Sequence, residues 1–263
     1  MIVDSKDNEN VLFIYRLGGV EAQNFFIEYA HQNIQNSIVY YLGNNCQKDQ
    51  YEILKIIDLN KIDVVINLAA NDITLDVHFL LRIKSNYKLK LIGWHSDIPE
   101  YFDSFLVYLS QIYDMVLVDD KSELQRYRNY GFISEVFNHG YDIKYRVDPN
   151  EERDIDVAFV GRMDRPGRTE LFSILLKKGF NIALYGDGTN NGFISSEKMM
   201  QVYARSKIIL NLTNISTAIP HFDSNRSINS LLSQSKGRIS EGAIAGAMIV
   251  SEPAVSLSFH GKN

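Results

Sequence analysis

The sequence predicts an α/β protein of two Rossmann-like lobes, each a parallel sheet covered by helices. Short apolar runs alternate with longer amphipathic stretches, and the alternation stops at a polar segment and then starts again. Near-continuous apolar strands separated by helices of about 10–15 residues are typical of parallel sheets. The chain of 263 residues is also long enough for two domains of ordinary size, roughly 100–150 residues each.

The first part of the chain contains six predicted strands and five predicted helices. The strand segments are short and rich in β-branched and aromatic residues, and they cover 11–15, 38–42, 64–68, 89–94, 115–118 and 135–138. The segments between them carry apolar residues at helical spacing, and we expect helices over 21–35, 50–59, 75–87, 101–112 and 122–130.

A polar segment separates the lobes, because residues 142–154 hold eight charged side chains in thirteen positions. We therefore predict an N-terminal lobe over 1–141, a linker over 142–154 and a C-terminal lobe over 155–263. In the second lobe we expect strands over 156–160, 182–185, 208–212 and 248–251, helices over 169–178, 197–205 and 241–247, and a Ser/Asn-rich loop over 213–234. Only twelve residues follow Ser251, so we expect this lobe to be incomplete at its C-terminus.

Composition and charge exclude several classes of protein. The net charge of −5 disfavours a nucleic-acid partner, because phosphate binding needs a basic surplus. With Cys46 as the one cysteine, no internal disulfide can form. Residues 1–10 lack the pattern of a signal peptide, and no apolar run approaches the roughly 20 residues of a membrane span. We therefore expect a cytoplasmic protein.

One cluster of basic residues is relevant to membrane binding. It consists of Arg82, Lys84, Lys88 and Lys90. We interpret it as a solvated face, and the alternative is a weak peripheral contact with anionic lipid.

In parallel sheets ligands bind beyond the carboxyl ends of the strands, so the residues that follow each strand are the candidates. Gly18 and Gly19 follow the first strand, where backbone amides can approach an anion; the alternative is a plain tight turn. The GxGxxG dinucleotide fingerprint is absent, which makes a nicotinamide-dependent dehydrogenase the least favoured reading.

A histidine and a carboxylate follow the fourth strand. His95 and Asp97 lie two residues apart, and such a pair can hydrogen-bond a sugar or act as a general base. Asp97 can equally cap a helix that has Pro99 in its first turn.

Three arginines follow the first strand of the second lobe. Arg162, Arg165 and Arg168 fall between a strand and a helix, and arginine forks bind phosphate oxygens in pairs. The alternative is a solvated turn paired with Asp164 and Glu170.

Two further second-lobe segments carry candidates. Gly186 lies in a Gly-Asp-Gly turn after the next strand, which alone is only a turn signal. Arg238 precedes Glu241 by three residues near the start of the last helix. A carboxylate there is stabilised by the helix dipole, and it can also accept hydrogen bonds from two ribose hydroxyls.

Four second-lobe segments together resemble the C-terminal half of GT-B glycosyltransferases in order and spacing. They are residues 157–167, 182–188, 199–211 and 237–253. The nearest similarity is to the CgeB-like (glycosyl transferases group 1) family, which is linked to spore-coat and surface polysaccharide genes. The first lobe adds weaker matches at 94–97 and 138–142, and before residue 88 the resemblance is only architectural.

The resemblance implies a nucleotide-sugar site. It assigns Arg162 and Arg168 to the diphosphate, with Arg165 assisting, and Glu241 to the ribose. Arg238 would lie near the phosphates or near Glu241. The remaining positions implied are Gly161 and Gly186 in the turns of this site, Gly18 and Gly19 across the cleft, and His95 at the donor sugar or the acceptor.

The resemblance also has a departure. Many retaining members carry a glutamate eight residues before the ribose-binding one, and Ser233 stands there, so the stereochemistry stays open. The one Asp-x-Asp pair, Asp154 and Asp156, precedes its strand. We therefore expect no metal and no cofactor, with the leaving-group charge met by arginines and helix dipoles.

The resulting hypothesis is a metal-independent hexosyltransferase. It would move a sugar from a nucleoside-diphosphate sugar to a glycan, lipid-linked or surface-polysaccharide acceptor, with His95 or Asp97 as base if the reaction inverts. Three alternatives remain. They are a nucleotide-sugar 2-epimerase of the same fold, a non-enzymatic two-lobed small-molecule binding protein, and an inactive truncated scaffold.

Overall fold

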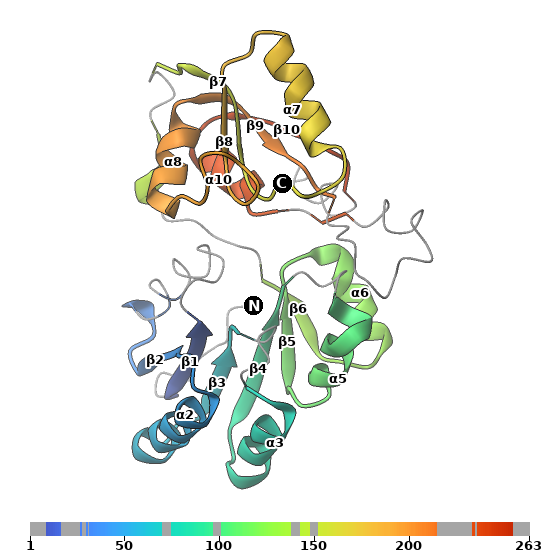
Figure 1. Ribbon diagram of the computed structural model, residues 1–263. Helices are drawn as coiled ribbons and strands as arrows, with labels where there is room; N and C mark the ends of the chain where they lie inside the picture. The colour runs from blue at the N-terminus through green and yellow to red at the C-terminus, as the bar shows by residue number, and fades with distance from the viewer. Residues whose placement is uncertain are drawn as a thin grey trace. The chain divides into compact units, whose positions relative to one another are not determined.

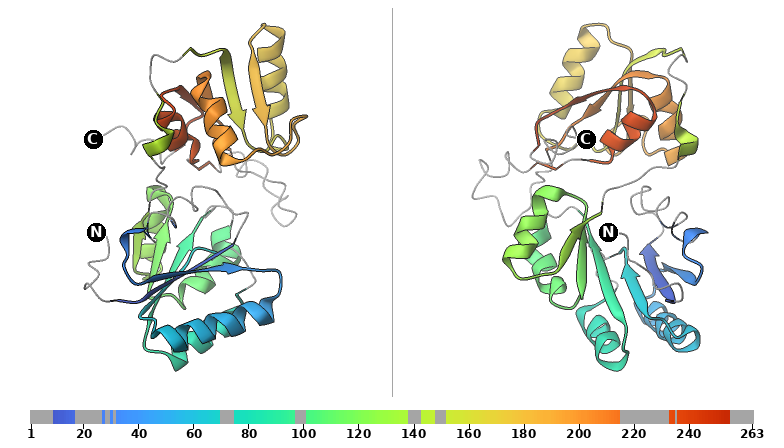
Figure 2. Two further views of the ribbon diagram at one scale, coloured as in Figure 1. Left: turned by 90° about the vertical axis from the view of Figure 1, so that its left-hand side faces the viewer. Right: turned by 180° about the vertical axis from the view of Figure 1, so that it is seen from behind.

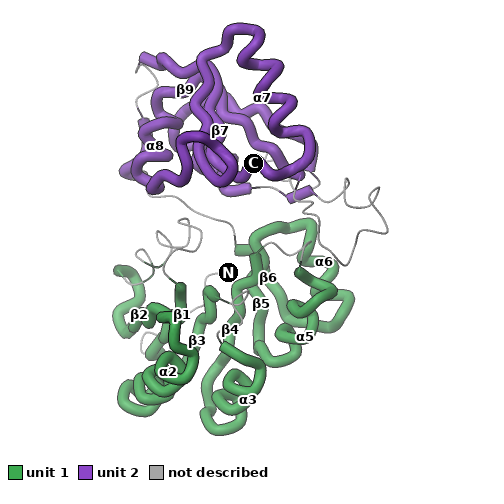
Figure 3. Tube along the Cα trace, in the orientation of Figure 1, with its two compact units in different colours: residues 1–139 green, residues 140–263 purple. Residues whose placement is uncertain are grey.

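The computed structural model describes residues 9–16, 27, 30, 32–69, 75–96, 101–137, 143–147, 152–214, 233–234 and 236–254. The chain divides into two compact units, residues 1–139 and 140–263 (Figure 3). Each unit contains its own parallel sheet. The predicted class, α/β with parallel sheets covered by helices, is confirmed.

Unit 1 contains a six-stranded parallel sheet in the order β2-β1-β3-β4-β5-β6 (Figure 1). The strands are β1 (Val11–Arg16), β2 (Ser37–Leu42), β3 (Val64–Asn67), β4 (Lys90–His95), β5 (Met115–Val118) and β6 (Ser134–Val136). Each lies within two residues of its predicted bounds, because runs of β-branched and aromatic residues in a sheet buried on both faces leave little ambiguity.

The described helices of unit 1 pack on one face of this sheet. They are α2 (Cys46–Asn60), α3 (Val77–Asn86), the π-helix η1 (Phe102–Leu106), α5 (Val107–Ser110) and α6 (Lys121–Asn129). Residues from all of them join Leu12, Val65 and Val116 in a single core cluster. The alternate strand residues, such as Phe13 and Trp94, form a second cluster on the other face. The helix predicted over 21–35 lies mostly outside the described residues.

Two helix predictions in unit 1 need correction. α2 begins four residues before the predicted start, because the side chain of Asn45 accepts a hydrogen bond from the Lys48 amide at 3.1 Å and caps the helix there. The single helix predicted over 101–112 is instead a π-helix followed by one short α-helix. Helical periodicity does not distinguish a π-turn from an α-turn over five residues.

Unit 2 contains a four-stranded parallel sheet in the order β10-β9-β7-β8. The strands are β7 (Ile155–Val160), β8 (Ile182–Tyr185), β9 (Ser206–Asn211) and β10 (Met248–Ser251). The helices are α7 (Arg168–Lys177), α8 (Ser196–Ala204) and α10 (Arg238–Ile244), with a 3-10 turn η2 (Ile143–Tyr145). α8 and α10 pack on one face and α7 on the other (Figure 2).

The largest differences from the predictions in unit 2 occur at two places. α10 begins at Arg238, three residues before the predicted start, and ends at Ile244, just before Gly246, which has a positive φ of 64°. The segment predicted as a linker contains η2, and Arg153 near its end donates to the carbonyls of Tyr203, Ser206 and Ala245. This end of the predicted linker is therefore part of unit 2.

Within the part of the chain that the structure describes, no helix has the length and apolar character needed to cross a membrane.

Candidate functional site

The candidate site lies at the carboxyl edge of the unit 2 sheet, which is the edge where its parallel strands end. Gly161 follows β7 and Gly186 follows β8, and the two turns are joined by main-chain hydrogen bonds. The Gly161 amide donates to the Tyr185 carbonyl at 2.9 Å, and the Met163 amide donates to the Asp187 carbonyl at 2.8 Å. Gly186 has a φ of +112°, and a Cβ there would collide with the Gly161 carbonyl. Both predicted glycines therefore lie in one pair of turns.

Arg238 reaches this pair of turns from α10. Its Nε donates to the carbonyl of Val160 at 2.9 Å, and its guanidinium lies 4.7 Å from the ring centroid of Phe159. One guanidinium nitrogen occupies the space that a Cβ on Gly161 would need. A larger residue directly after β7 would therefore displace the Arg238 guanidinium from its present position.

Arg168 approaches the same edge from the first turn of α7. Its side chain is only 6% exposed. Nη1 donates to the Arg162 carbonyl at 2.5 Å, and Nη2 donates to the carbonyls of Leu212 at 3.3 Å and Asn214 at 3.0 Å. The guanidinium lies 5.2 Å from the Phe159 ring centroid. Arg168 therefore ties the turn after β7 to the residues that follow β9.

The two guanidiniums of Arg168 and Arg238 share one environment, since both lie near the ring of Phe159 and both donate to the Leu212 carbonyl. Burial, with the nearby charges of Arg238 and Arg165, lowers the pKa of Arg168 to about 10, although Glu252 and Asp164 oppose the shift. Arg168 is still a cation at neutral pH. Two cations in a partly buried place favour an anion beside them.

Arg162 and Arg165 are more accessible than Arg168. The Arg162 side chain is about half exposed; its Nη2 lies 2.5 Å from an oxygen of Asp164 and its Nε lies 3.9 Å from Asp187. The Arg162 guanidinium lowers the pKa of the Asp164 carboxyl. Arg165 is partly buried. The pairing with Asp164 that the sequence left open is present, so Arg162 would exchange a carboxylate for a phosphate on binding one.

Glu241 lies in the first turn of α10 and is buried. The buried hydroxyl of Tyr203 on α8 is close enough to be affected by its charge. Burial, and after it the charge of Glu241, raises the pKa of Tyr203 well above its usual value, and Arg238 acts in the opposite direction. The Glu241 carboxylate therefore lies in the same electrostatic environment as Arg238.

Glu252 is a site residue that sequence analysis missed. It follows β10, and its Oε2 accepts hydrogen bonds from the amides of Thr213 at 2.8 Å and Asn214 at 3.2 Å. These bonds hold the residues after β9 whose carbonyls receive Arg168. The available signal was its position, since an acid directly after a parallel strand lies at the same edge as the other strand ends.

His95, at the end of β4 in unit 1, is completely buried. Nδ1 lies 2.8 Å from the Tyr127 hydroxyl, and Nε2 is buried without a hydrogen-bond partner among the described residues. Burial lowers the pKa of His95 to about 3, so the ring is neutral at neutral pH. Its predicted contact with a substrate requires a movement that exposes the ring. The structure does not bring His95 to a described surface.

Three other predicted site residues, Gly18, Gly19 and Asp97, lie outside the described residues. Asn67, which the sequence analysis did not select, is buried at the end of β3. Its side-chain amide donates to the Tyr113 hydroxyl at 2.8 Å, and its oxygen accepts from the Ala69 amide at 3.0 Å. Asn67 therefore organises the end of this strand.

The aspartate just before β7 and the aspartate within β7 each form an ion pair with a basic side chain of unit 2. Asp154 pairs with Arg205, and Asp156 pairs with Lys207 at 2.7 Å. Across the described ranges, no group of three or more His, Cys, Asp or Glu side chains is arranged to hold a metal ion.

A solved structure shares the fold of the chain. HepE (Alr3699) from Anabaena, crystallised in complex with UDP, is 12% identical, with a TM-score of 0.63 over 97% of this chain and 83% of that chain. The chain has a GT-B fold.

Two further structures are much less similar. A LacI-family regulator, CcpA from Weissella paramesenteroides with bound glucose, has a TM-score of 0.35 at 11% identity, over 93% of this chain and 95% of that one. A C2-type ketoreductase of a modular polyketide synthase has a TM-score of 0.28 at 10% identity, over 94% of this chain and 56% of that one. Neither supports an argument about function.

No known protein family matches the sequence. No well-characterised protein matches it by sequence either. The resemblance to the CgeB-like family therefore stays a prediction.

Proposed function

We propose that the protein is a glycosyltransferase that takes a sugar from a nucleoside-diphosphate sugar and passes it to a hydroxyl acceptor. The observation that carries the proposal is the pair of guanidiniums, Arg168 and Arg238, at the carboxyl edge of the unit 2 sheet. Parallel sheets bind ligands at this edge. The GT-B fold, shared with a protein that binds UDP, makes a uridine diphosphate donor the first candidate.

In this proposal the donor diphosphate lies over the turns that begin at Gly161 and Gly186. Arg162 contacts it directly, because its side chain is about half exposed, with Arg165 assisting. Arg168 donates to three main-chain carbonyls and mainly holds the turn in shape. The charges of Arg168 and Arg238 then stabilise the diphosphate as it leaves.

The ribose is assigned to Glu241, as the resemblance implies. A carboxylate accepts hydrogen bonds from two hydroxyls at once. We propose that no metal takes part, since arginines supply the positive charge at the leaving group. His95 and Asp97 remain the proposed candidates for the base.

We propose that the acceptor is a hydroxyl of a glycan, of a lipid-linked sugar or of a surface polysaccharide, bound by unit 1.

The proposal is tested by calorimetric titration of UDP and uridine into the wild-type protein and Arg162→Ala, with and without magnesium. We expect Arg162→Ala to weaken UDP binding by about tenfold or more, since a charge-assisted hydrogen bond contributes about 1.5–3 kcal/mol. Uridine binding is expected to stay unchanged. Arg205→Ala is the matched control, because Arg205 pairs with Asp154 before β7, at the opposite edge of the sheet.

Equal losses for UDP and uridine in Arg162→Ala would remove the diphosphate role from this residue. GDP, CDP and ADP are titrated in parallel, and wild-type protein that binds none of the four diphosphates contradicts the proposal. Incubation with a bound nucleotide sugar then distinguishes the reactions. Transfer to an added acceptor supports the glycosyltransferase, and a change of sugar configuration without an acceptor supports the 2-epimerase.

A further inference from the structure

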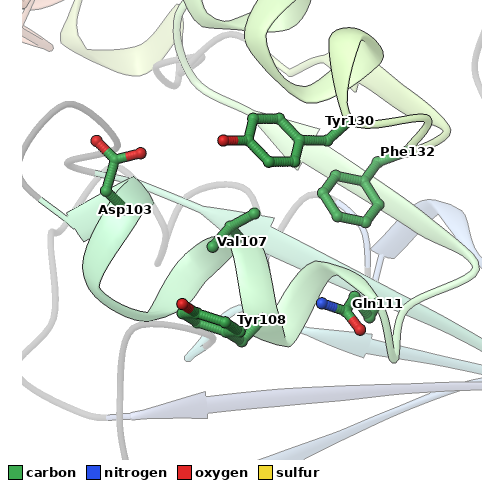
Figure 4. A pocket seen from close by; sticks show the side chains of 6 residues that line it. All are labelled: Asp103, Val107, Tyr108, Gln111, Tyr130 and Phe132. Carbon is green, nitrogen blue, oxygen red and sulfur yellow. The ribbon is translucent and has the colours of Figure 1, made fainter.

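A second candidate binding site lies in unit 1, in an open groove of about 350 Å³ between η1 and α5 on one side and the end of α6 on the other (Figure 4). The groove is lined by Asp103, Val107, Tyr108, Gln111, Tyr130 and Phe132. Its volume is at the lower end of the range for small-molecule sites, roughly 300–1,000 Å³. None of these residues belongs to the site proposed for the donor.

The groove exposes aromatic side chains. The Tyr108 side chain is 62% exposed and that of Tyr130 is 59% exposed. The rings of Tyr130 and Phe132 are parallel within 4°, with centroids 6.2 Å apart. They form one side of the groove, and Tyr108 comes from α5 (Figure 4). Flat π surfaces of this kind bind the C–H faces of sugar rings.

Polar groups complete the lining. The Asp103 carboxylate lies on the π-helix η1, and its Oδ2 receives a hydrogen bond from Arg126 at 2.6 Å, which fixes its orientation. The Gln111 side chain offers both a donor and an acceptor. π-helical turns often occur at functional sites, and among the described residues this one carries the only carboxylate that lines the groove. The combination of aromatic faces with a carboxylate and an amide suits an uncharged, hydroxyl-rich ligand.

One end of the groove lies away from the edge where a parallel sheet binds its main ligand, whereas Asp103, in the first turn of η1 after β4, lies toward that edge. Gln111 precedes β5, and Tyr130 and Phe132 precede β6, so these residues lie toward the amino ends of those strands. The transfer site is expected at the carboxyl ends. A ligand at the end formed by Gln111, Tyr130 and Phe132 would therefore be held away from the reacting atoms.

We propose that this groove binds a neutral saccharide segment. That this segment belongs to the acceptor glycan rests on the function proposed above. The groove holds a part of the acceptor distant from the hydroxyl that reacts and so raises the occupancy of the transfer site. An anionic ligand is disfavoured because the described residues of the lining include one carboxylate and no cationic side chain.

The test uses saturation-transfer NMR on the whole protein without nucleotide. The probes are the free tetrasaccharides cellotetraose, maltotetraose and chitotetraose. We expect at least one to bind, and Tyr108→Ala and Gln111→Ala each to weaken that binding by about tenfold. Tyr51→Ala is the matched control, since Tyr51 is a 65% exposed tyrosine on α2, away from the groove.

Two outcomes overturn the inference: no binding of any probe, or equal binding by Tyr108→Ala and Tyr51→Ala. In transfer assays to the bound oligosaccharide we expect Tyr108→Ala to raise the KM for the acceptor with kcat unchanged. The proposed function fails separately. Protein that binds a tetrasaccharide through Tyr108 but no nucleoside diphosphate contradicts the donor site and keeps the groove, and the reverse result contradicts only the groove.

Discussion

The His95 imidazole is completely buried, and among the described residues its Nε2 has no hydrogen-bond partner. Its burial makes the stability of the protein depend on pH. Its pKa is about 3 in the folded protein, where burial disfavours the charged ring, against 6.5 when it is unperturbed. The unfolded chain therefore takes up a proton between these values that the folded protein does not. Stability falls as the pH falls through this interval.

We predict that His95 alone lowers the free energy of unfolding by about 2 kcal/mol between pH 7 and pH 5, since each pKa unit is worth about 1.4 kcal/mol. His95→Gln lacks this term. Urea unfolding of both proteins across pH 5–7 measures it, and the difference at pH 7 gives the packing cost of the substitution as a baseline. Parallel pH curves for the two proteins would show that burial of His95 does not have this effect.

Gly186 shows how a single backbone conformation keeps the donor turns together. Its φ of +112° is one that L side chains rarely adopt, and a Cβ would meet the main chain of Gly161, which has little freedom to move. Gly192, in the same connection between β8 and α8, also has a positive φ, of +62°, but a Cβ there meets nothing within 4 Å.

We predict that Gly186→Ala destabilises the protein by about 3 kcal/mol, through strain and main-chain collision together. Gly192→Ala is the control and should cost about 1 kcal/mol, because only the unfavourable φ contributes. Urea denaturation of the two variants measures both values. The collision argument is wrong if the two substitutions cost the same.

At the scale of elements, α2, α3, α6 and α8 each begin where a polar side chain accepts a hydrogen bond from an otherwise free backbone amide. Asp76 caps α3 by accepting a hydrogen bond from the Phe79 amide at 2.7 Å, and Gln50 of α2 donates to its other oxygen at 3.1 Å. The bond from Phe79 is the main reason that the pKa of Asp76 is lowered. One carboxylate thus begins α3 and joins it to α2.

We predict that Asp76→Ala costs about 1 kcal/mol of stability, the usual value for a lost cap. Asp76→Ser keeps a hydroxyl acceptor and should lose less. Because the pKa of Asp76 is lowered by folding, its charged form stabilises the fold above its unfolded pKa, and this contribution disappears as the pH falls through the folded pKa. Thermal unfolding at pH 7 compares the three proteins, and equal losses in both variants would contradict a capping role.

At the scale of the whole molecule, the residues proposed to bind the donor belong to one unit, and the proposed base and the saccharide groove belong to the other. The arginines and Glu241 belong to unit 2, whereas His95 and the aromatic groove belong to unit 1. A nucleotide alone should therefore act mainly on unit 2.

We predict that UDP slows amide exchange most in the turns after β7 and β8 and at the start of α10. Hydrogen-exchange mass spectrometry of the whole chain measures this, with peptides from β1 and β3 as the internal control. If the strongest protection appeared in the sheet of unit 1 and none around Gly161, the nucleotide would bind unit 1 and the proposed donor site would be wrong.

Much of the fold was predictable because the strands are apolar runs bounded by polar turns. β5, β8 and β10 have the bounds that the sequence predicted, since their local composition decides them. The π-helix η1 was not predictable, because a change from i→i+4 to i→i+5 bonding leaves no mark in the spacing of apolar residues over five positions. The start of α10 was missed because its N-cap residue, Gly237, has no side chain that could cap the helix.

The candidate site was predictable only as a set of residue types. That Gly161, Arg162, Arg168 and Glu241 lie near strand ends follows from their places in the sequence. The sequence does not show that the guanidinium of Arg168 donates its hydrogen bonds to main-chain carbonyls. Nor does it show that the Arg238 side chain fills the space beside Gly161. These contacts join residues far apart in the chain.

The sequence by itself determined the alternating elements, the parallel sheets and the two units, because each depends on local hydrophobic pattern and on the short reach of each connection. Only the tertiary structure decided which polar side chains are buried and what they contact. His95 ends an apolar strand and Arg162 follows one. His95 is nevertheless enclosed by Tyr113 and Tyr127, whereas the Arg162 side chain is half exposed. Burial depends on side chains that come from distant segments, and local pattern carries no information about them.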